Sequence, residues 1–165
     1  MSLRSSLGPV ILMFAGCSGR TFDHDQALAN LEEQADRFRE ATVKRDFERV
    51  FEMSHPKIVF QDDRNRKQFI KFRAQAADDA PTEITLDDIT LMKGARSNAY
   101  AVIRVKRTYR PDPRYQRNQD WKTWVAVSSD YGDSWKFIDH MLGSLKTLFP
   151  DFPDLPLPRD RDRWD

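Results

Sequence analysis

Cysteine and histidine are scarce in this sequence, with one cysteine and three histidines among 165 residues. Cys17 has no second cysteine with which to form a disulfide within the chain. His24, His55 and His140 lie far apart, and no two have the spacing of metal ligands on one helix face. We therefore predict no metal site, and the absence of any cofactor-binding motif predicts no cofactor.

Neither sign of charge is in excess. Lys and Arg number 27 and Asp and Glu number 26, and without Arg4, the one charged residue of the first 16, each total is 26. A chain so balanced has no overall field to attract nucleic acid or an anionic bilayer. We predict no nucleic-acid partner, and any electrostatic recognition must come from a local patch. The G-x-S-x-G turn of serine hydrolases and the phosphate-binding P-loop are absent as well.

Long apolar runs are also missing near the N-terminus, where residues 10–15 fall far short of the roughly 20 residues that cross a bilayer. This run follows Arg4 and precedes small residues, which is the order of a signal peptide. The tetrapeptide Phe14-Ala15-Gly16-Cys17 resembles the lipobox of bacterial lipoproteins, with Phe14 where leucine is usual. The resemblance implies that residues 1–16 are removed and that a lipid is attached to Cys17.

Lipidation of Cys17 would also remove a free thiol, which is a liability in an oxidising compartment. Several acyl chains, at about 0.8 kcal/mol per buried methylene, would hold the protein on the membrane. Ser18 resembles the sorting signal of Gram-negative lipoproteins, which implies an outer-membrane anchor with the protein facing the periplasm. The alternatives are an ordinary secreted protein, cut at an Ala-x-Ala-like site, and a cytosolic protein with a ragged start.

Residues 25–54 carry a helical pattern that is interrupted once. The apolar residues that recur three or four positions apart, and so share one face, are Leu28, Leu31, Ala35, Phe38 and Ala41. The pattern loses phase at residues 44–46, where Asp46 is suited to cap a second helix. A third helix is predicted at residues 66–77. Its expected buried residues are Phe69, Ile70 and Phe72.

Four strands are predicted after the helices. Residues 83–92 alternate with a slip at Asp87-Asp88, which predicts a β-bulge or tight bend, and residues 99–110 alternate without a slip. Residues 121–129 and 134–141 complete a hairpin.

Helices followed by antiparallel strands predict an α+β fold in which N-terminal helices pack on a curved antiparallel sheet. The chain resembles the NTF2-like, or cystatin-like, superfamily over most of residues 25–141. The resembling elements are the long first helix, Lys44-Arg45-Asp46, His55-Pro56-Lys57-Ile58-Val59 and Ser134-Trp135-Lys136-Phe137-Ile138-Asp139. The resemblance implies a cone with one open pocket, often a homodimer through the sheet, but no particular reaction.

The expected organisation has four segments. Residues 1–16 form a signal peptide, 17–24 a tether, 25–148 an NTF2-like domain and 149–165 a tail. The tail is rich in proline and ends in alternating Arg and Asp, so it cannot form helix or sheet. We expect it to be mobile or wrapped on the surface.

Residues 128–135 match the Asp-box pattern S-x-D-x-G-x-T-W, with Ser134 in place of threonine. In such a turn the Asp130 carboxylate accepts backbone N–H groups, Gly132 supplies a positive φ and Trp135 packs beneath. Sialidases carry the pattern several times on propeller blades. Because it occurs once in a chain too short for a propeller, we interpret it as a turn without a catalytic role.

Asp139 is the one candidate for acid–base chemistry. It shares a strand face with Trp135 and Phe137, which mark the face as inward. Burial would raise the pKa of the carboxyl toward the range of a general base. The alternative is a carboxylate at a strand end, either solvated or paired to an arginine. Tyr100 and Trp124 are the other predicted lining residues of a ligand pocket with Asp139, although aromatics on strands more often belong to the core.

A run of basic residues covers the end of one predicted strand and the loop after it. These residues are Arg104, Lys106, Arg107, Arg110, Arg114 and Arg117. Together they would hold an anionic envelope component, such as lipid A phosphates or glycan carboxylates. The alternative is a solvated face with intramolecular salt bridges.

Two functions are compatible with these features. The first is an envelope-anchored lipoprotein whose non-enzymatic domain binds a small ligand or an envelope protein. The second is an isomerase- or dehydratase-type enzyme with Asp139 as general base. We favour the first because the sequence offers one candidate carboxylate and no dyad. His55 and His140 are interpreted as structural or exposed residues.

Overall fold

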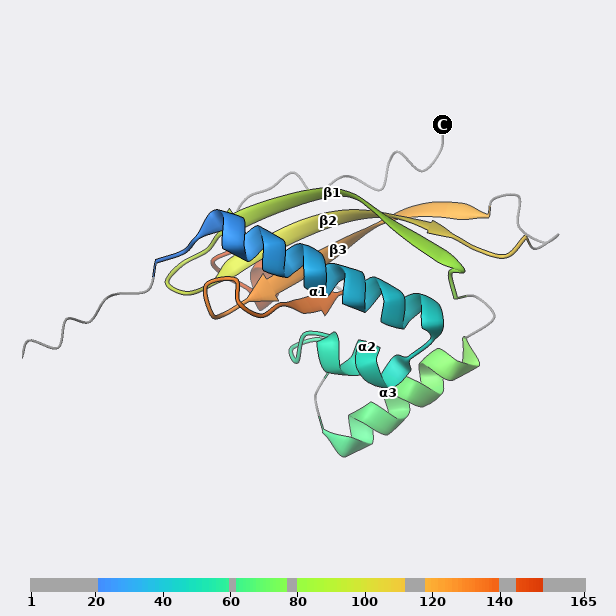
Figure 1. Ribbon diagram of the computed structural model, residues 1–165. Coiled ribbons are helices and arrows are strands. Elements are labelled where there is room, and N and C mark those ends of the chain that lie inside the picture. Colours follow the sequence, from blue (N-terminus) through green and yellow to red (C-terminus); the bar gives the residue numbers. More distant parts are fainter. Residues whose placement is uncertain (1–20, 60–61, 77–79, 112–117, 140–144, 153–165) are drawn as a thin grey trace, which may run out of the picture.

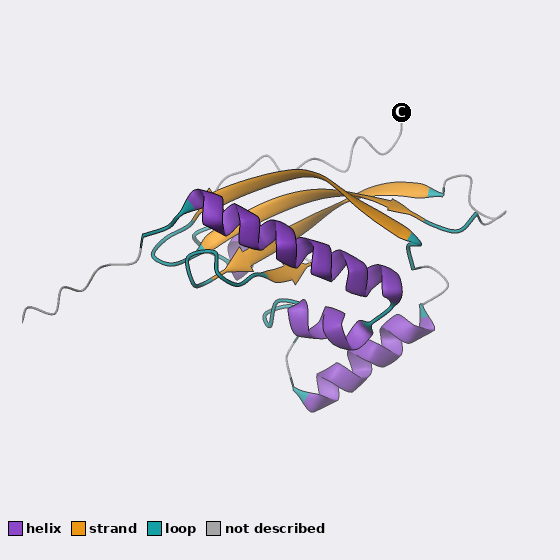
Figure 2. Ribbon diagram, in the orientation of Figure 1, coloured by secondary structure: helices purple, strands orange, loops and turns teal. Residues whose placement is uncertain are grey.

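A computed structural model describes residues 21–59, 62–76, 80–111, 118–139 and 145–152, which form an α+β fold (Figure 1 and Figure 2). Three helices come first, and they are α1 (His24–Lys44), α2 (Phe47–Met53) and α3 (Asp63–Gln75). The strands follow as β1 (Glu83–Lys93), β2 (Ala99–Thr108), β3 (Gln119–Ser128) and β4 (Lys136–Ile138). A short helix, α4 (Leu145–Leu148), comes after the sheet.

Aspartate caps start each of the first three helices. The Asp23 carboxylate accepts from the Gln26 backbone N–H, and Asp46 and Asp62 accept in the same way from residues three positions on. Arg45 ends α1 in the left-handed conformation, with φ of 62°. The predicted interruption and the Asp46 cap are therefore confirmed.

Among the described residues, four strands form one open antiparallel sheet in the order β1-β2-β3-β4, with β1 and β4 outermost and a single parallel bridge from Ser54 to Phe137 of β4. The β1–β2 register shifts between Leu86 and Asp88, which confirms the predicted bulge. β4 is shorter than the predicted strand at residues 134–141, because Ser134 and Trp135 belong to the preceding turn. Residues 140–144 lie outside the described residues.

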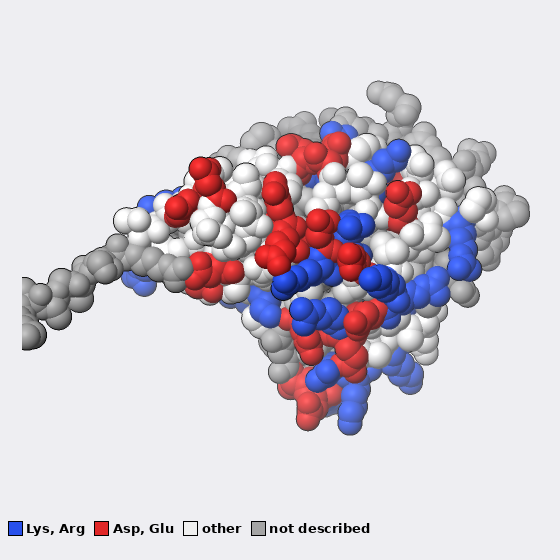
Figure 3. Space-filling view, viewed as in Figure 1, with Lys and Arg blue, Asp and Glu red and all other residues white. Residues whose placement is uncertain are grey.

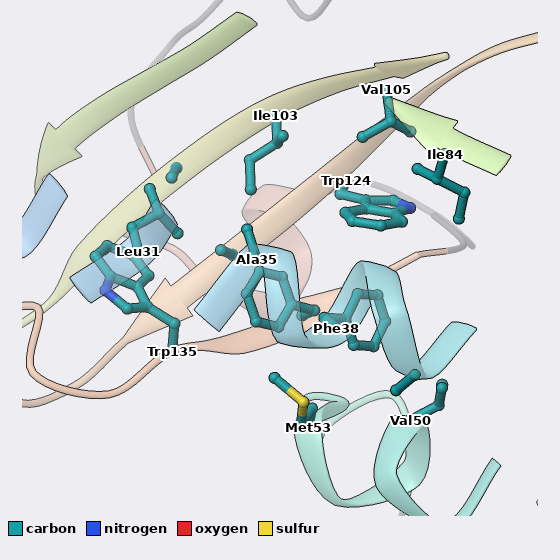
Figure 4. Packing of buried hydrophobic residues seen from close by; sticks show 14 of the residues in the cluster. Leu31, Ala35, Phe38, Val50, Met53, Ile84, Ile103, Val105, Trp124 and Trp135 are labelled. Carbon is teal, nitrogen blue, oxygen red and sulfur yellow. The ribbon is translucent and has the colours of Figure 1, made fainter. Parts of the chain in front are cut away.

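The helix face is the face of the sheet that α1 covers (Figure 1). From α1, Leu31, Ala35 and Phe38 pack onto it, together with Ala27 and Ala41. Figure 4 shows Phe38 between the strands and α2, with Trp124 and Ile103 on the sheet side. Of the five predicted stripe residues only Leu28 is half-buried, and Ala27 is buried in its place.

The outer face of the sheet has its own apolar cluster. Its members are Tyr100, Val102, Val125, Val127, Ile138, Phe149 and Phe152. Phe149 and Phe152 belong to the predicted tail, yet both are buried, so the packed domain continues beyond residue 148 to at least Phe152. The physical reason is that β2 and β3 carry apolar residues on both faces here, and the second face also needs a cover.

α3 contacts the rest of the protein along one narrow side. The Phe69 ring lies 5.5 Å from the Phe51 ring of α2, and Phe69 and Ile70 are half-buried. Phe72 is 69% exposed, so the prediction that it is buried is wrong. At about 100° per residue, Phe72 lies well around the helix from the side that holds Phe69, Ile70 and Arg73.

Candidate functional site

Asp139 follows β4 at the end of the helix face, and three elements meet around it. Its Oδ1 accepts a hydrogen bond from Trp124 Nε1 of β3 at 2.7 Å. Its Oδ2 accepts one from Arg73 Nη2 of α3 at 3.2 Å, and Arg107 Nη1 of β2 lies 3.9 Å from Oδ1. The side chain is 9% exposed. The predicted inward orientation is confirmed, and the carboxylate is paired with arginine.

Arg107 links Asp139 to a second carboxylate. Its Nε and Nη2 donate to the two oxygens of Asp120 at 3.0 and 3.1 Å, in a bidentate pair. The Tyr109 hydroxyl lies 3.2 Å from Asp120 Oδ1, and Lys122 Nζ lies 3.9 Å from Oδ2. We call Arg73, Asp139, Arg107, Asp120 and Tyr109 the ion network.

The electrostatics of the network favour the charged arginine. Burial lowers the pKa of Arg107, but the hydrogen bond to Asp120 and the charge of Asp139 more than offset this, and the pKa is raised overall. Burial also raises the pKa of the Tyr109 hydroxyl. Arg107 therefore stays a cation and Tyr109 stays neutral at physiological pH.

The space beside Asp139 beneath α1 is occupied by aromatic rings. The Phe38 ring packs edge-on against Trp124 at 5.0 Å and stacks on Phe137 at 4.8 Å. All three side chains are fully buried. A substrate approaching Asp139 from this side would have to displace core side chains, which are packed at close to crystal density.

Tyr100 does not belong to this site. Tyr100 belongs to the apolar cluster on the outer face of the sheet. Trp124 belongs to the cluster on the helix face, and Asp139 lies on that face as its hydrogen-bond partner. The Tyr100 hydroxyl donates to Asp151 Oδ1 at 2.5 Å. Burial, followed by this bond to Asp151, raises the pKa of Tyr100. The expectation that Tyr100, Trp124 and Asp139 line one pocket is corrected.

The basic run is likewise divided between the two faces. Arg104 and Lys106 lie on the outer face, where the Arg104 guanidinium sits 4.3 Å from the centre of the exposed Trp121 ring. Arg107 lies on the helix face and is engaged by Asp120. Arg110 is exposed, and Arg114 and Arg117 lie outside the described residues. The structure does not bring Arg104, Lys106 and Arg107 into one anion-binding patch.

An open groove lies between α1 and the edge strand β1, with a volume of about 670 Å³. Its lining residues are Leu28, Glu32, Asp36, Arg39, Glu83, Ile84, Thr85, Leu86, Asp87 and Ile89. In Figure 3, which has the orientation of Figure 1, acidic side chains lie over α1 and along the sheet edge above it, with basic side chains among them. We call this feature the α1–β1 groove.

The Asp-box segment is a turn, as predicted. Asp130 Oδ1 accepts from the Ser134 backbone N–H at 3.0 Å, and Trp135 Nε1 donates to the Gly132 carbonyl at 3.1 Å. Gly132 has φ of +91°, and a Cβ there would lie 2.4 Å from Ala27 Cβ. The turn therefore locks the N-terminal half of α1 to the sheet.

Of the remaining predicted residues, His55 is the one that the structure describes, and it adds no second site. His55 is half-buried, with its ring 4.9 Å from that of Phe149, while Cys17 and His140 lie outside the described residues. Among the residues that the structure describes, no three His, Cys, Asp or Glu side chains form a group able to hold a metal. None of the described helices has both the length and the apolar character needed to span a membrane.

Comparison with known proteins assigns no function to these residues. No family model matches the chain, and no curated protein matches it significantly. The sequence did not identify Arg73 as a partner of Asp139, or Asp120 as a partner of Arg107. Asp120 was detectable in principle, because it stands directly opposite Arg107 once the β2–β3 register is known.

Proposed function

We propose that this chain is a lipoprotein of the bacterial envelope, anchored through Cys17 in the outer membrane and facing the periplasm. Its domain is proposed to be an NTF2-like cone that binds a protein or a ligand and catalyses no reaction. The order of elements supports the fold assignment, since α1 breaks at Arg45 and the antiparallel sheet follows the helices. The lipobox-like residues at Cys17 support the anchor.

The state of Asp139 carries the non-enzymatic assignment. A general base needs a carboxylate that can reach a substrate proton in an open pocket. Both oxygens of Asp139 instead face donors, from Trp124 and Arg73, and Arg107 adds a second cation. Phe38 and Phe137 fill the adjoining interior. The network thus has the features of a structural ion pair. We therefore place the binding of a protein or ligand on the exterior of the domain, away from Asp139.

The anchor is tested by metabolic labelling with radioactive palmitate in a Gram-negative host. We expect label on the wild-type chain and none on Cys17→Ser, because only a thiol accepts the first lipid. Ser18→Ala, which keeps the thiol, should be labelled like the wild type. Equal labelling of wild type and Cys17→Ser would overturn the lipoprotein assignment.

The non-enzymatic assignment is tested by thermal shift of the mature chain against anionic glycans, lipid A analogues, steroids and fatty acids. A ligand at about 100 times its Kd adds about 2.7 kcal/mol of stability, enough for a clear rise in Tm. We expect any compound that raises Tm of the wild type to do so equally for Asp139→Asn. Asp25→Asn, at a fully exposed position, is the matched control. An apolar compound whose shift is lost only in Asp139→Asn would favour the isomerase or dehydratase instead.

A further inference from the structure

β1 offers an unpaired strand edge next to the α1–β1 groove. It pairs with β2 on one side, and no described strand pairs with it on the other. An edge strand presents free backbone N–H and C=O groups, which extended segments of other proteins use for strand addition. The bulge at Asp87 limits such pairing to the flanking halves of β1, of which residues 83–86 line the groove.

The floor of the groove retains accessible apolar surface. Leu28 of α1 and Leu86 and Ile89 of β1 are only partly buried, although they pack against the main core. Next to them Ile84 is 2% exposed and closes the bottom of the groove. An apolar side chain from an added strand would complete the burial of these residues.

The rim of the groove is acidic. Four acidic residues, Glu32, Asp36, Glu83 and Asp87, line the groove with one basic residue, Arg39, and Asp87 also lies 3.9 Å from Arg104. Arg39 is paired with Asp36 at 2.9 Å. Glu32 and Glu83 form no ion pair or side-chain hydrogen bond with any other described residue. Their charges are therefore available to an incoming cation.

We propose that the α1–β1 groove docks an extended protein segment in which apolar and basic residues alternate. The segment adds to the free edge of β1, with its apolar side chains on the floor. The alternate Lys or Arg side chains point to the opposite face of the sheet beside Glu83, and Glu32 attracts the segment through its charge at the rim of the groove. A second copy of this chain fits less well, because pairing two β1 edges brings the acidic residues of both copies together. The inference rests on the proposed binding function and names its partner.

The probe is a synthetic peptide of alternating valine and lysine, titrated into the mature lipoprotein in detergent and followed by amide NMR shifts. We expect the shifts to cluster on β1 and the facing side of α1. Reversing the rim charges with Glu32→Lys and Glu83→Lys together should weaken binding by at least about tenfold at about 0.15 M salt, where the Debye length is about 8 Å. A valine–glutamate peptide should not bind.

The matched control is the double variant Glu33→Lys and Glu40→Lys. It makes the same change in charge on exposed residues of α1 that do not line the groove. It should bind the peptide within about threefold of the wild type, because its charges are further from the groove and are screened by salt. An equal loss of affinity in both double variants would show attraction by net charge alone and would overturn the groove as the site.

Strand addition is tested with two N-methylated peptides, one methylated at the odd-numbered residues and the other at the even-numbered residues. Only one register points its N–H groups at β1, so methylation should abolish binding in one register and spare it in the other. Equal effects of the two would overturn strand addition. Shifts that cluster elsewhere would overturn the groove while leaving the binding function intact, and palmitate labelling tests the anchor independently. A dimer that is lost on reversing Glu32 and Glu83 would identify a second copy as the occupant instead.

Discussion

The two faces of the sheet are covered in different ways. The 21-residue helix α1 covers the helix face with an unbroken apolar stripe. Among the described residues, the outer face is covered at one end, by the segment from α4 to Phe152, which inserts Phe149 and Phe152. Between these two rings, Asp151 accepts hydrogen bonds from Tyr100 Oη at 2.5 Å and Asn98 Nδ2 at 3.0 Å. The helix α1 is held on the sheet by its apolar face. The short segment from α4 to Phe152 is held by two buried rings and also by the hydrogen bonds of Asp151.

The largest effect on the free energy of unfolding is expected in the core between α1 and the sheet. Trp124→Ala should lower the free energy of unfolding by about 3–5 kcal/mol, because it opens a cavity beneath Phe38 and removes a donor to Asp139. Urea denaturation measures the loss. Trp121→Ala on the open part of the outer face is the control and should cost under about 1 kcal/mol. Similar losses for both would contradict the contrast between the faces.

A smaller effect is expected at the outer-face cover. Phe152→Ala should cost about 2–3 kcal/mol, since the ring is buried but only a short segment holds it. Hydrogen exchange should show faster opening at the backbone amides of β2 and β3 in Phe152→Ala than in the wild type. Unchanged stability would mean that the segment after α4 does not seal this face.

The ion network should contribute less to the free energy of unfolding than the apolar packing on either face of the sheet. Asp139→Ala should cost about 2 kcal/mol, because it leaves Arg73 and the Trp124 N–H without their acceptor. Asp139→Asn keeps an oxygen for Trp124 and should cost roughly half as much. Thermal unfolding at constant pH compares the two. A stability gain in Asp139→Asn would indicate a carboxylate held under strain for catalysis, and not a structural pair.

The smallest effect concerns pH at the outer-face cover. Burial, followed by the charges of Lys57 and Lys136, lowers the pKa of His55 from 6.5 to about 4. Between these values the unfolded chain binds a proton that the folded chain does not, so this contribution to stability is complete above pH 6.5 and is lost as pH falls toward 4. His55→Gln should flatten the dependence of Tm on pH in that window. An unchanged profile would show that other groups cause it.

Local patterns were sufficient for α1 to α3 and β1 to β4, and insufficient for α4 and for the site. The break at Arg45, the Asp46 cap and the bulge at Asp87 depend on residues a few positions apart, so the sequence displays them. Arg73 lies 66 residues from Asp139, and no local pattern joins them. Phe72 was wrongly predicted to be buried, because helical spacing does not show how much of the surface of α3 the neighbouring elements cover.

The sequence by itself determined the first three helices and the four strands to within a few residues, but not the short helix α4, and it determined that Asp139 points inward with Trp135 and Phe137. Period-3.6 and period-2 patterns and capping chemistry act within a few residues, so no partner is needed to specify them. Only the tertiary structure decided that Arg73 and Arg107 meet Asp139, that Tyr100 turns away from it, and that Phe149 and Phe152 are core. These outcomes depend on which surfaces remain uncovered after α1 has packed, and burying that apolar area is a property of the assembled chain.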